Sequence, residues 1–372
     1  MFTFRNYNWR KYDVGLLVIV SILVGISAFL LYASGDLPHM KRQIAAFAVG
    51  LVIAGIVSVL DYHFVSKMSF LYYFVVMVML FMVRFTRFGD DLTTGAYRWL
   101  NLGFMEIQVS ELAKIALILI LADYFMRHKD NVNQFRYLML AVLIAAAPTF
   151  LIMIQTDLSS SMVMIFIFVI MYFVAGLSYK IIGLVTLVGV PAFVALLWYV
   201  QQPWQVILST KQQQRILGFF DPETYAQSYM YQQNQSVAAI SSGGLLGKFI
   251  EGVKPMTGLS SKVYVNESDF IFSVAGEVLG FLGCLLLIIL LALIIVRCVM
   301  IARNARDKLG YYIAIGVSAM FMFQFFVNIG VATALLPNTG LPLPFLSYGM
   351  SSLISSMIAI GLILNVGLQQ QR

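Results

Sequence analysis

Ten apolar stretches constrain this chain more than any other feature. A helix rises about 1.5 Å per residue, so crossing about 30 Å of hydrocarbon takes roughly 20 residues. Because no water reaches the backbone inside lipid, spanning segments of this kind must be helical. The pattern predicts an all-α, polytopic membrane protein of about ten transmembrane helices, at residues 14–33, 43–60, 68–85, 109–126, 136–154, 158–176, 181–200, 269–296, 310–335 and 347–367.

The composition agrees with lipid as the solvent of this chain. Hydrophobic residues make up 60% of it and charged residues 11%, with a mean hydropathy of +0.87. Soluble domains carry about 25% charged residues. We therefore expect a single membrane domain over residues 1–372. The first apolar stretch lacks a small-residue cleavage site, so we interpret it as a true span and not as a signal peptide.

Basic residues predict how the chain is threaded. Cytoplasmic loops carry an excess of Lys and Arg, whereas long loops follow this rule poorly. With the N-terminus inside, 13 basic residues lie on the inner side and 5 in short outer loops, so both termini are predicted to be cytoplasmic. The inner set is Arg5, Arg10, Lys11, Lys67, Arg127, Lys129, Arg136, Lys180, Arg297, Arg303, Arg306, Lys308 and Arg372, and the outer set is Lys41, Arg42, Arg84, Arg87 and Arg98.

Several functional classes are disfavoured. Cys284 and Cys298 both lie in or beside one apolar stretch and are interpreted as small hydrophobic residues. The chain has no HExxH, no CxxC and no histidine cluster, so we expect no zinc or haem site. The net charge of +7 is explained by basic cytoplasmic loops that meet anionic membrane lipid, so no nucleic-acid partner is expected.

Two predicted outer segments are long enough to be functional. Residues 86–108 contain Arg98 and Trp99, and residues 201–268 form the one large extracytoplasmic loop. That loop mixes polar and apolar stretches, including Gly243-Gly244-Leu245-Leu246-Gly247. We expect short amphipathic helices that lie on the outer membrane face.

Charged residues within membrane spans are costly and usually functional, and two such features lie near the outer face. Glu111 and Lys114 are three residues apart on one predicted helix face and can form an ion pair that only orients two helices, or one that serves a substrate. Asp157 lies in a tight turn between two spans. It can cap a helix beginning at Leu158, and such capping is compatible with ligand contact.

Two further carboxylates lie where the large loop re-enters the membrane. Asp269 opens an apolar helix, where an acid is favoured by the helix dipole, but Ser268 can cap that helix without burying a charge. Asp269 is also well placed to meet a substrate at the lipid–water boundary. Glu277 is flanked by Gly276 and Gly280, which permit close helix packing. We interpret Glu277 as a buried structural hydrogen-bonding group.

The last outer segment, residues 336–352, breaks the helix with prolines and glycines. Hydroxyl side chains then open the final span, at Ser347, Tyr348, Ser351 and Ser352. Backbone amides beside hydroxyls suit a phosphate or a sugar, with Ser347 as the candidate ligand. A simple loop and helix cap explain the same spacing.

Six sequence blocks in order resemble the signature blocks of the SEDS family (shape, elongation, division and sporulation), which includes RodA, FtsW and SpoVE. The resemblance covers essentially the whole chain. Within the family, the sequence Asp221-Pro222-Glu223 after Arg215 favours RodA. The blocks are GAYRWLNLGFMEIQVSELAKIA, QTDLSSS, QRILGFFDPE, SGGLLGK, ESDFIFSVAGEVLG and PLPFLSYGMSS.

The resemblance implies a ten-span peptidoglycan glycosyltransferase of the bacterial cytoplasmic membrane. Such an enzyme polymerises lipid II on the outer face and works with a class B penicillin-binding protein, the transpeptidase. The essential aspartate of the family falls on Asp269. Its other site positions fall on Arg98-Trp99, Ser110, Glu111, Lys114, Gln155-Thr156-Asp157 and Arg215.

The residues fit that chemistry. Asp269 is expected to take the proton of the acceptor hydroxyl as general base. Lys114, Arg98 and Arg215 are expected to bind the pyrophosphate, with Glu111 orienting Lys114 and with a possible divalent cation, Mg²⁺ or Mn²⁺. Two other classes remain open, namely a lipid-linked-sugar flippase or other transporter, and a non-catalytic scaffold for the transpeptidase.

Overall fold

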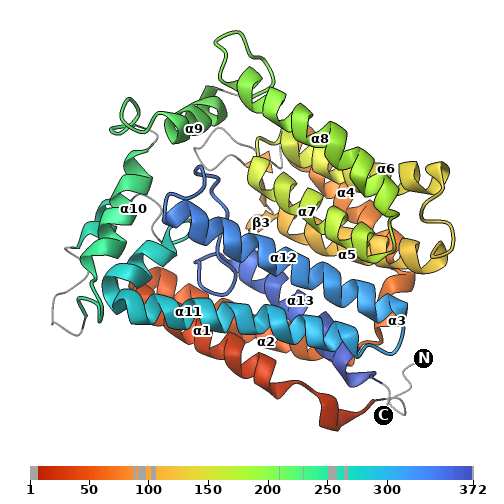
Figure 1. The fold of residues 1–372 in the computed structure, drawn as a ribbon. Coiled ribbons are helices and arrows are strands. Elements are labelled where there is room, and N and C mark those ends of the chain that lie inside the picture. Colours follow the sequence, from red (N-terminus) through yellow and green to blue (C-terminus); the bar gives the residue numbers. More distant parts are fainter. Residues whose placement is uncertain are drawn as a thin grey trace.

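The computed structural model describes residues 7–86, 89–90, 98–101, 106–208, 210–228, 230–249, 258–263 and 267–370. Within them, ten helices of 17 to 33 residues run roughly along one direction (Figure 1). Each corresponds to one of the predicted spans. They are α1 Val14–Ala33, α2 Leu37–Val59, α4 Ser69–Phe85, α5 Val109–Arg127, α6 Phe135–Ile154, α7 Leu158–Val174, α8 Tyr179–Val200, α11 Ile271–Arg303, α12 Lys308–Ala332 and α13 Met350–Leu368.

These helices match a membrane protein in length and composition. In the described part of the chain, seven of them are long and apolar enough to cross a bilayer, and α4 and α7 are apolar helices of 17 residues. The remaining helix, α5, carries four charged residues, which are Glu111, Lys114, Asp123 and Arg127. The predicted all-α, polytopic fold is confirmed.

The two ends of the chain lie at the same end of the bundle. The Asn8 N–H donates to the Leu368 carbonyl at 2.8 Å, and Figure 1 places the two termini together. We call this the terminal end and the opposite end the site end. A common end for both termini agrees with an even number of crossings, while the direction of insertion stays a prediction.

Aspartates set the start of several helices. Asp13, Asp36 and Asp307 each accept a hydrogen bond from the backbone N–H three residues on, as N-caps of α1, α2 and α12. Because Asp36 caps α2 and Pro38 follows in its first turn, α2 begins at Leu37, six residues before the predicted residue 43. A short helix, α3 Tyr62–Lys67, and the 3₁₀ turn Trp9–Lys11 lie at the terminal end.

The helix α11 is broken at Gly280. This glycine has φ +67° and ψ −166°, so the predicted span 269–296 is not one continuous helix. The large loop supplies the hydrogen bonds that the break leaves open: Lys248 N–H donates to the Glu277 carbonyl at 3.0 Å, and Phe281 N–H donates to the Gly244 carbonyl at 2.9 Å. A Cβ at Gly280 would lie 2.3 Å from the Gly247 nitrogen. Only glycine tolerates this approach.

The large loop contains the short helices α9 Thr210–Phe220 and α10 Tyr231–Ser242 and the 3₁₀ turn Leu259–Lys262. The helix α10 packs against α11, where a Cβ at Gly276 would meet Ile240 at 2.8 Å, as close packing at this glycine predicts. Gln233 and Ser236 of α10 donate to carbonyls at the end of α12. The predicted short helices are therefore present, and their position on the membrane face stays a prediction.

The predicted outer loop 86–108 contains a small antiparallel sheet that the sequence did not reveal. Its strands are β1 Gly89–Asp90, β2 Trp99–Asn101 and β3 Glu106–Gln108, in the order β1-β2-β3. Trp99 pairs with both Asp90 and Gln108, and Leu100 is buried. The sheet holds the strand that follows Arg98 at the site end.

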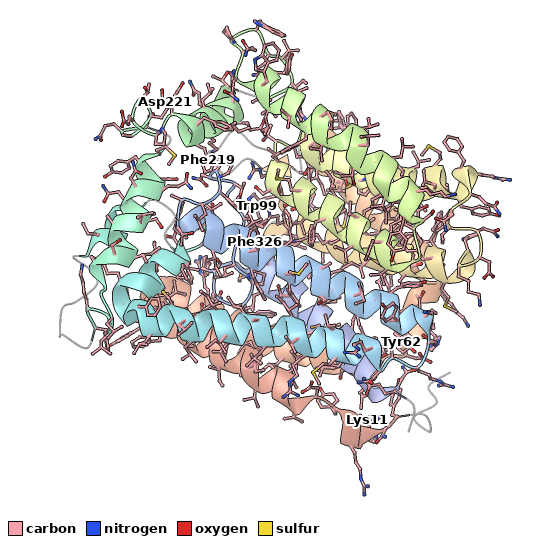
Figure 2. The ribbon with its side chains drawn as sticks, viewed as in Figure 1. Lys11, Tyr62, Trp99, Phe219, Asp221 and Phe326 are labelled. Carbon is pink, nitrogen blue, oxygen red and sulfur yellow. The ribbon has the colours of Figure 1, made fainter. Side chains whose placement is uncertain are left out.

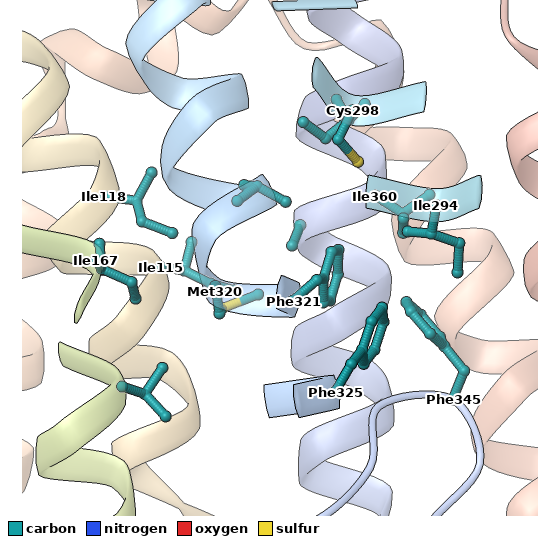
Figure 3. Packing of buried hydrophobic residues seen from close by; sticks show 14 of the residues in the cluster. Ile115, Ile118, Ile167, Ile294, Cys298, Met320, Phe321, Phe325, Phe345 and Ile360 are labelled. Atoms are coloured by element: carbon teal, nitrogen blue, oxygen red, sulfur yellow. The ribbon is translucent and has the colours of Figure 1, made fainter. Parts of the chain in front are cut away.

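The core of the bundle lies among α5, α7, α11, α12 and α13. Phe321, Phe325 and Phe345 pack together there, and Figure 3 shows Met320 on one side of these rings and Ile294 on the other. Helix α8 does not take part, because only Val200 of its residues is buried, and it lies at the edge of the molecule in Figure 1. An apolar helix exposed in this way fits lipid contact.

Candidate functional site

Asp269 lies in the turn that precedes α11 and does not cap that helix. The N-cap position is Phe270, which makes no capping hydrogen bond through its side chain. The Asp269 carboxylate instead accepts a hydrogen bond from the Ser268 hydroxyl at 3.2 Å. A Cβ at Gly340, which has φ +73°, would lie 3.1 Å from Asp269 Oδ2. Neither Asp269 nor Ser268 caps α11 through its side chain, so the predicted Ser268 cap is wrong, and the Asp269 carboxylate lies against the loop between α12 and α13.

Two arginines from distant segments act on this carboxylate. Burial raises the pKa of Asp269 above its ordinary value, and the Ser268 hydroxyl, Arg215 and Arg98 oppose that rise. Arg215 lies in α9, and Arg98 lies directly before β2. The fold thus brings together three of the predicted site residues, which are 54 to 171 positions apart in the sequence by subtraction of their numbers.

Arg98 is anchored by one end of its guanidinium. Its Nη2 donates to the Thr156 carbonyl at 2.6 Å, and Gln212 of α9 donates to the same oxygen at 3.5 Å. Thr156 has φ +61°, which turns this carbonyl out of the helical direction. Among the described residues, no acceptor reaches the buried Nε of Arg98. This donor is available for an anion.

The site lies at one end of the molecule. In Figure 2, Trp99, which follows Arg98, and Phe219 and Asp221, at the end of α9, lie far from Lys11 and Tyr62 at the terminal end. The segments that carry Arg98 and Arg215 therefore lie at the end of the bundle away from the chain ends.

Asp157 acts as a helix cap, as one of its two interpretations predicted. It accepts hydrogen bonds from the Ser160 N–H at 3.1 Å, the Ser160 hydroxyl at 2.8 Å and the Ser110 hydroxyl at 3.4 Å, and α7 begins at Leu158. The side chain is almost fully buried. A direct contact between Asp157 and a substrate stays a prediction.

Glu111 and Lys114 form the predicted ion pair. Lys114 Nζ lies 2.8 Å from Glu111 Oε1, and both side chains are buried within the bundle. Ser355 of α13 donates to the Glu111 carbonyl at 3.0 Å, which ties α5 to α13. A buried pair of this kind satisfies both charges at a high desolvation cost. Whether Lys114 also meets a substrate stays a prediction.

Ser347 uses its hydroxyl within the protein. It accepts from the Leu343 N–H at 2.7 Å and donates to the Ser268 carbonyl. The hydroxyl thus joins the loop after α12 to the residue before Asp269. This geometry favours a positioning role for Ser347 over the predicted contact with a phosphate or sugar.

Glu277 has the structural role that the sequence predicted. Its carboxylate is fully buried and accepts from Lys248 Nζ at 2.6 Å, the Leu259 N–H at 2.8 Å and the Ser260 N–H at 2.7 Å. Glu277 therefore ties two parts of the large loop to α11.

The sequence analysis missed Asn328 of α12 and Gln212 of α9, which both donate hydrogen bonds at the site. A signal was present for Asn328, because a carboxamide in an apolar helix is costly unless it is bonded. Gln212 lies among three consecutive glutamines in a loop, so its position carried no such signal.

A resident metal site finds little support in these side chains. Among the described residues, no group of three or more His, Cys, Asp or Glu side chains is placed to hold a metal ion. The carboxylates at the site are Asp269 and Glu267, and the negative charge of Glu267 raises the pKa of Asp269 further. Mg²⁺ is often held by one or two carboxylates together with substrate phosphates, so a cation would need the substrate to complete its shell.

Fold and site together define a polytopic membrane protein with a carboxylate on which two arginines act at one end of its bundle. The family model described as "Cell cycle protein", which covers FtsW, RodA and SpoVE, matches residues 8–372. The chain belongs to this family, as the sequence predicted.

Named relatives agree along nearly the whole chain. The "Peptidoglycan glycosyltransferase MrdB" of Escherichia coli K12 is 33% identical over 353 residues, which cover 94% of this chain and 92% of the relative. A chain from a peptidoglycan synthase complex, studied for its coordination of polymerization and crosslinking, superposes with a TM-score of 0.81 at 28% identity and covers 96% of this chain and 98% of its own length. The rod shape determining protein RodA of Thermus thermophilus superposes at 0.70 with 26% identity, covering 98% and 99%.

Proposed function

We propose that this protein is a peptidoglycan glycosyltransferase that polymerises lipid II on the outer face of the bacterial cytoplasmic membrane. The observation that carries the proposal is that Arg98 and Arg215, from two distant segments, both act electrostatically on the Asp269 carboxylate at the site end. A glycosyl transfer from a prenyl pyrophosphate needs a base for the acceptor hydroxyl and cations for the leaving group. This arrangement supplies both.

The proposed step is a single displacement. An acceptor sugar hydroxyl attacks the anomeric carbon of the donor, and its proton passes to the Asp269 carboxylate as the new glycosidic bond forms. The bond between the anomeric carbon and the pyrophosphate oxygen breaks, and its electron pair leaves with the polyprenyl pyrophosphate. One displacement inverts the configuration at the anomeric carbon.

The arginines have the role of stabilising the negative charge that develops on the leaving group. Arg98 contributes its unbonded buried Nε, and Arg215 contributes the positive charge that acts on Asp269. Lys114 is a further candidate for this role, held by Glu111. A divalent cation, Mg²⁺ or Mn²⁺, brought by the pyrophosphate would neutralise charge there, and no step depends on it.

The proposed partner is a class B penicillin-binding protein, the transpeptidase that crosslinks the new strand. Support comes from the likeness to a chain of a peptidoglycan synthase complex, and that complex was studied for polymerization together with crosslinking. Exposed apolar surface on α8 and α11 offers lipid-facing area on which a single-span partner helix can pack.

The test uses the purified protein in lipid nanodiscs with labelled lipid II, with and without the transpeptidase. We expect glycan strands that a muramidase digests to disaccharide units. The flippase alternative is tested with the same protein in sealed vesicles. If lipid II crosses their bilayer and no strand forms, the protein is a flippase. If neither occurs and the transpeptidase is nevertheless bound and activated, the protein is a scaffold.

A further inference from the structure

Three consecutive backbone carbonyls around Asp269 each accept one hydrogen bond from the C-terminal part of the chain. The carbonyls belong to residues 267–269. Their donors, in that order, are the Tyr348 N–H at 2.8 Å, the Ser347 hydroxyl and the Asn328 amide at 2.9 Å. We call these three bonds the carbonyl clamp. It fixes the backbone at the residue whose carboxylate faces Arg98 and Arg215.

Asn328 is the member of the clamp that acts on Asp269 itself. It lies in α12 with 1% of its surface exposed. Its two amide hydrogens bond the Asp269 carbonyl at 2.9 Å and the Leu341 carbonyl at 2.7 Å. One side chain therefore crosslinks the turn before α11 to the loop between α12 and α13, and that loop also places Gly340 against the Asp269 carboxylate.

The cost of burying Asn328 calls for a compensating role. Among the described residues, no donor reaches its buried Oδ1. A buried polar atom without a partner costs about 1–3 kcal/mol. A leucine at this position would fill similar space in an apolar helix without that cost, so helix packing alone does not explain the asparagine.

Asn365 offers a comparison within the same chain. It is also fully buried, and it also makes two hydrogen bonds to backbone groups: its Nδ2 donates to the Ser58 carbonyl at 2.7 Å, and its Oδ1 accepts from the Tyr62 N–H at 2.9 Å. Asn365, however, lies at the terminal end. The two asparagines share their residue type and burial, but the Asn365 Oδ1 accepts hydrogen bonds from Tyr62 and Gln369, and the two side chains hold different segments.

We propose that Asn328 is a positioning residue for glycosyl transfer, which holds the Asp269 backbone so that the carboxylate meets the acceptor hydroxyl. This inference rests on the proposed function. Because both hydrogen bonds that Asn328 donates to the described residues go to backbone carbonyls, it contributes no proton and no charge to the reaction, and its effect passes through the orientation of Asp269.

The test compares Asn328→Leu with Asn365→Leu in the lipid II assay at matched amounts of folded protein. We expect Asn328→Leu to lower kcat about 10- to 100-fold while the KM for lipid II changes less than about threefold, because misplacing a catalytic group by about 1 Å can cost 10²-fold. Asn365→Leu should lose thermal stability and keep kcat per folded molecule.

The pH profile separates positioning from plain destabilisation. Burial is the largest influence that raises the pKa of Asp269. A loosened turn admits water to the carboxylate, so the acid limb of kcat should move to lower pH in Asn328→Leu and stay in place in Asn365→Leu. If Asn328→Leu fails to fold, Ser347→Ala serves as the second variant. It removes only the Ser347 hydroxyl, which donates to the Ser268 carbonyl in the carbonyl clamp. The same changes in kcat and pH profile are expected.

The outcomes distinguish this inference from the function beneath it. A wild-type protein that makes no polymer, with or without its transpeptidase, ends the proposed function. A wild type that polymerises lipid II, together with Asn328→Leu or Ser347→Ala variants of unchanged kcat and pH profile, overturns the positioning role alone. Equal loss of kcat in Asn328→Leu and Asn365→Leu overturns it as well.

Discussion

At the residue scale, the site contains carboxylates of contrasting roles. The Asp157 carboxylate accepts hydrogen bonds from Ser160 and Ser110, and the Glu277 carboxylate accepts them from Lys248 and from backbone amides. Asp269 accepts one hydrogen bond, from Ser268. Because only Asp269 of these three keeps its carboxylate largely free among the described contacts, it is the one suited to take a proton.

Substituting Asp269 tests its role as base. Asp269→Asn keeps the shape of the side chain and cannot accept the proton, and a general base contributes about 10²–10⁴-fold in rate. We expect Asp269→Asn and Asp269→Ala to lose polymer formation at normal expression and partner binding, and Asp269→Glu to retain weak activity. Polymer amount and length are measured at matched protein levels, and a fully active Asp269→Asn protein would refute the assignment.

Exchanging Glu111 and Lys114 separates their two interpretations. The double variant Glu111→Lys, Lys114→Glu keeps the buried pair with its charges reversed. A purely structural pair should recover activity in the exchange relative to either single variant. We expect a folded protein with little polymerisation, because Lys114 is proposed to face the pyrophosphate. Recovery to wild-type rates would remove Lys114 from the site.

At the element scale, two segments distant in sequence complete each other. The break in α11 leaves backbone groups without a partner inside the helix, and backbone groups of the large loop form hydrogen bonds with them. This close approach needs glycine in both segments, at Gly280 of α11 and at Gly247 of the loop.

At the terminal end, His63 of α3 joins the starts of two helices. Its Nδ1 lies 2.9 Å from Asp61, the cap of α3, and its Nε2 lies 2.6 Å from Asp307, the cap of α12.

Gly280→Ala tests the break in α11. A Cβ there would lie 2.3 Å from the Gly247 nitrogen at a φ of +67°, so both sterics and backbone strain oppose it. We expect the thermal midpoint to fall by several degrees, for a cost of about 1–3 kcal/mol. Gly25→Ala is the matched control, since a Cβ at Gly25 meets nothing within 4 Å. Equal midpoints in the two variants would count against the strain argument.

His63 predicts a pH dependence of stability. Its hydrogen bond to Asp307 raises the pKa of His63 above the ordinary value, and Asp61 adds to the rise. A raised folded-state pKa stabilises the protein below the unfolded pKa of about 6.5, and this contribution is lost as pH rises through the folded value. The thermal midpoint should fall as pH rises from about 6 to 8, and His63→Gln should flatten that slope. An unchanged slope would exclude His63 as its source.

At the scale of the whole molecule, the two ends of the bundle differ in kind. The terminal end joins both chain ends and the His63 contacts, and the site end carries the large loop, the small sheet and Asp269. Outer-face chemistry requires that the site end be extracytoplasmic. The basic residues predict that direction.

Cysteine labelling tests the direction of insertion. The native Cys284 and Cys298 are buried, so they add little background. A cysteine at Ser241, exposed in the large loop, should react with an impermeant maleimide added to intact cells. A cysteine at Asn304, exposed between α11 and α12, should react only after the membrane is opened. The reverse pattern would place the site in the cytoplasm and contradict polymerisation outside.

The amino-acid sequence by itself determined the membrane fold and the helix count, and it named most of the candidate site residues. These properties depend on local information: apolar length sets a span because lipid is the solvent, and an aspartate before a helix sets its start. The family blocks identified Asp269, Arg98 and Arg215 as candidates without placing them in space.

Only the tertiary structure decided what those residues meet. The break at Gly280, which the large loop pairs, and the clamp through Asn328 depend on groups far apart in the chain. Hydrogen bonds between distant segments produce no periodic pattern of residue types in the sequence. They form only when helix packing brings the site end together, because a buried polar group must then find its partner among whatever the fold places beside it.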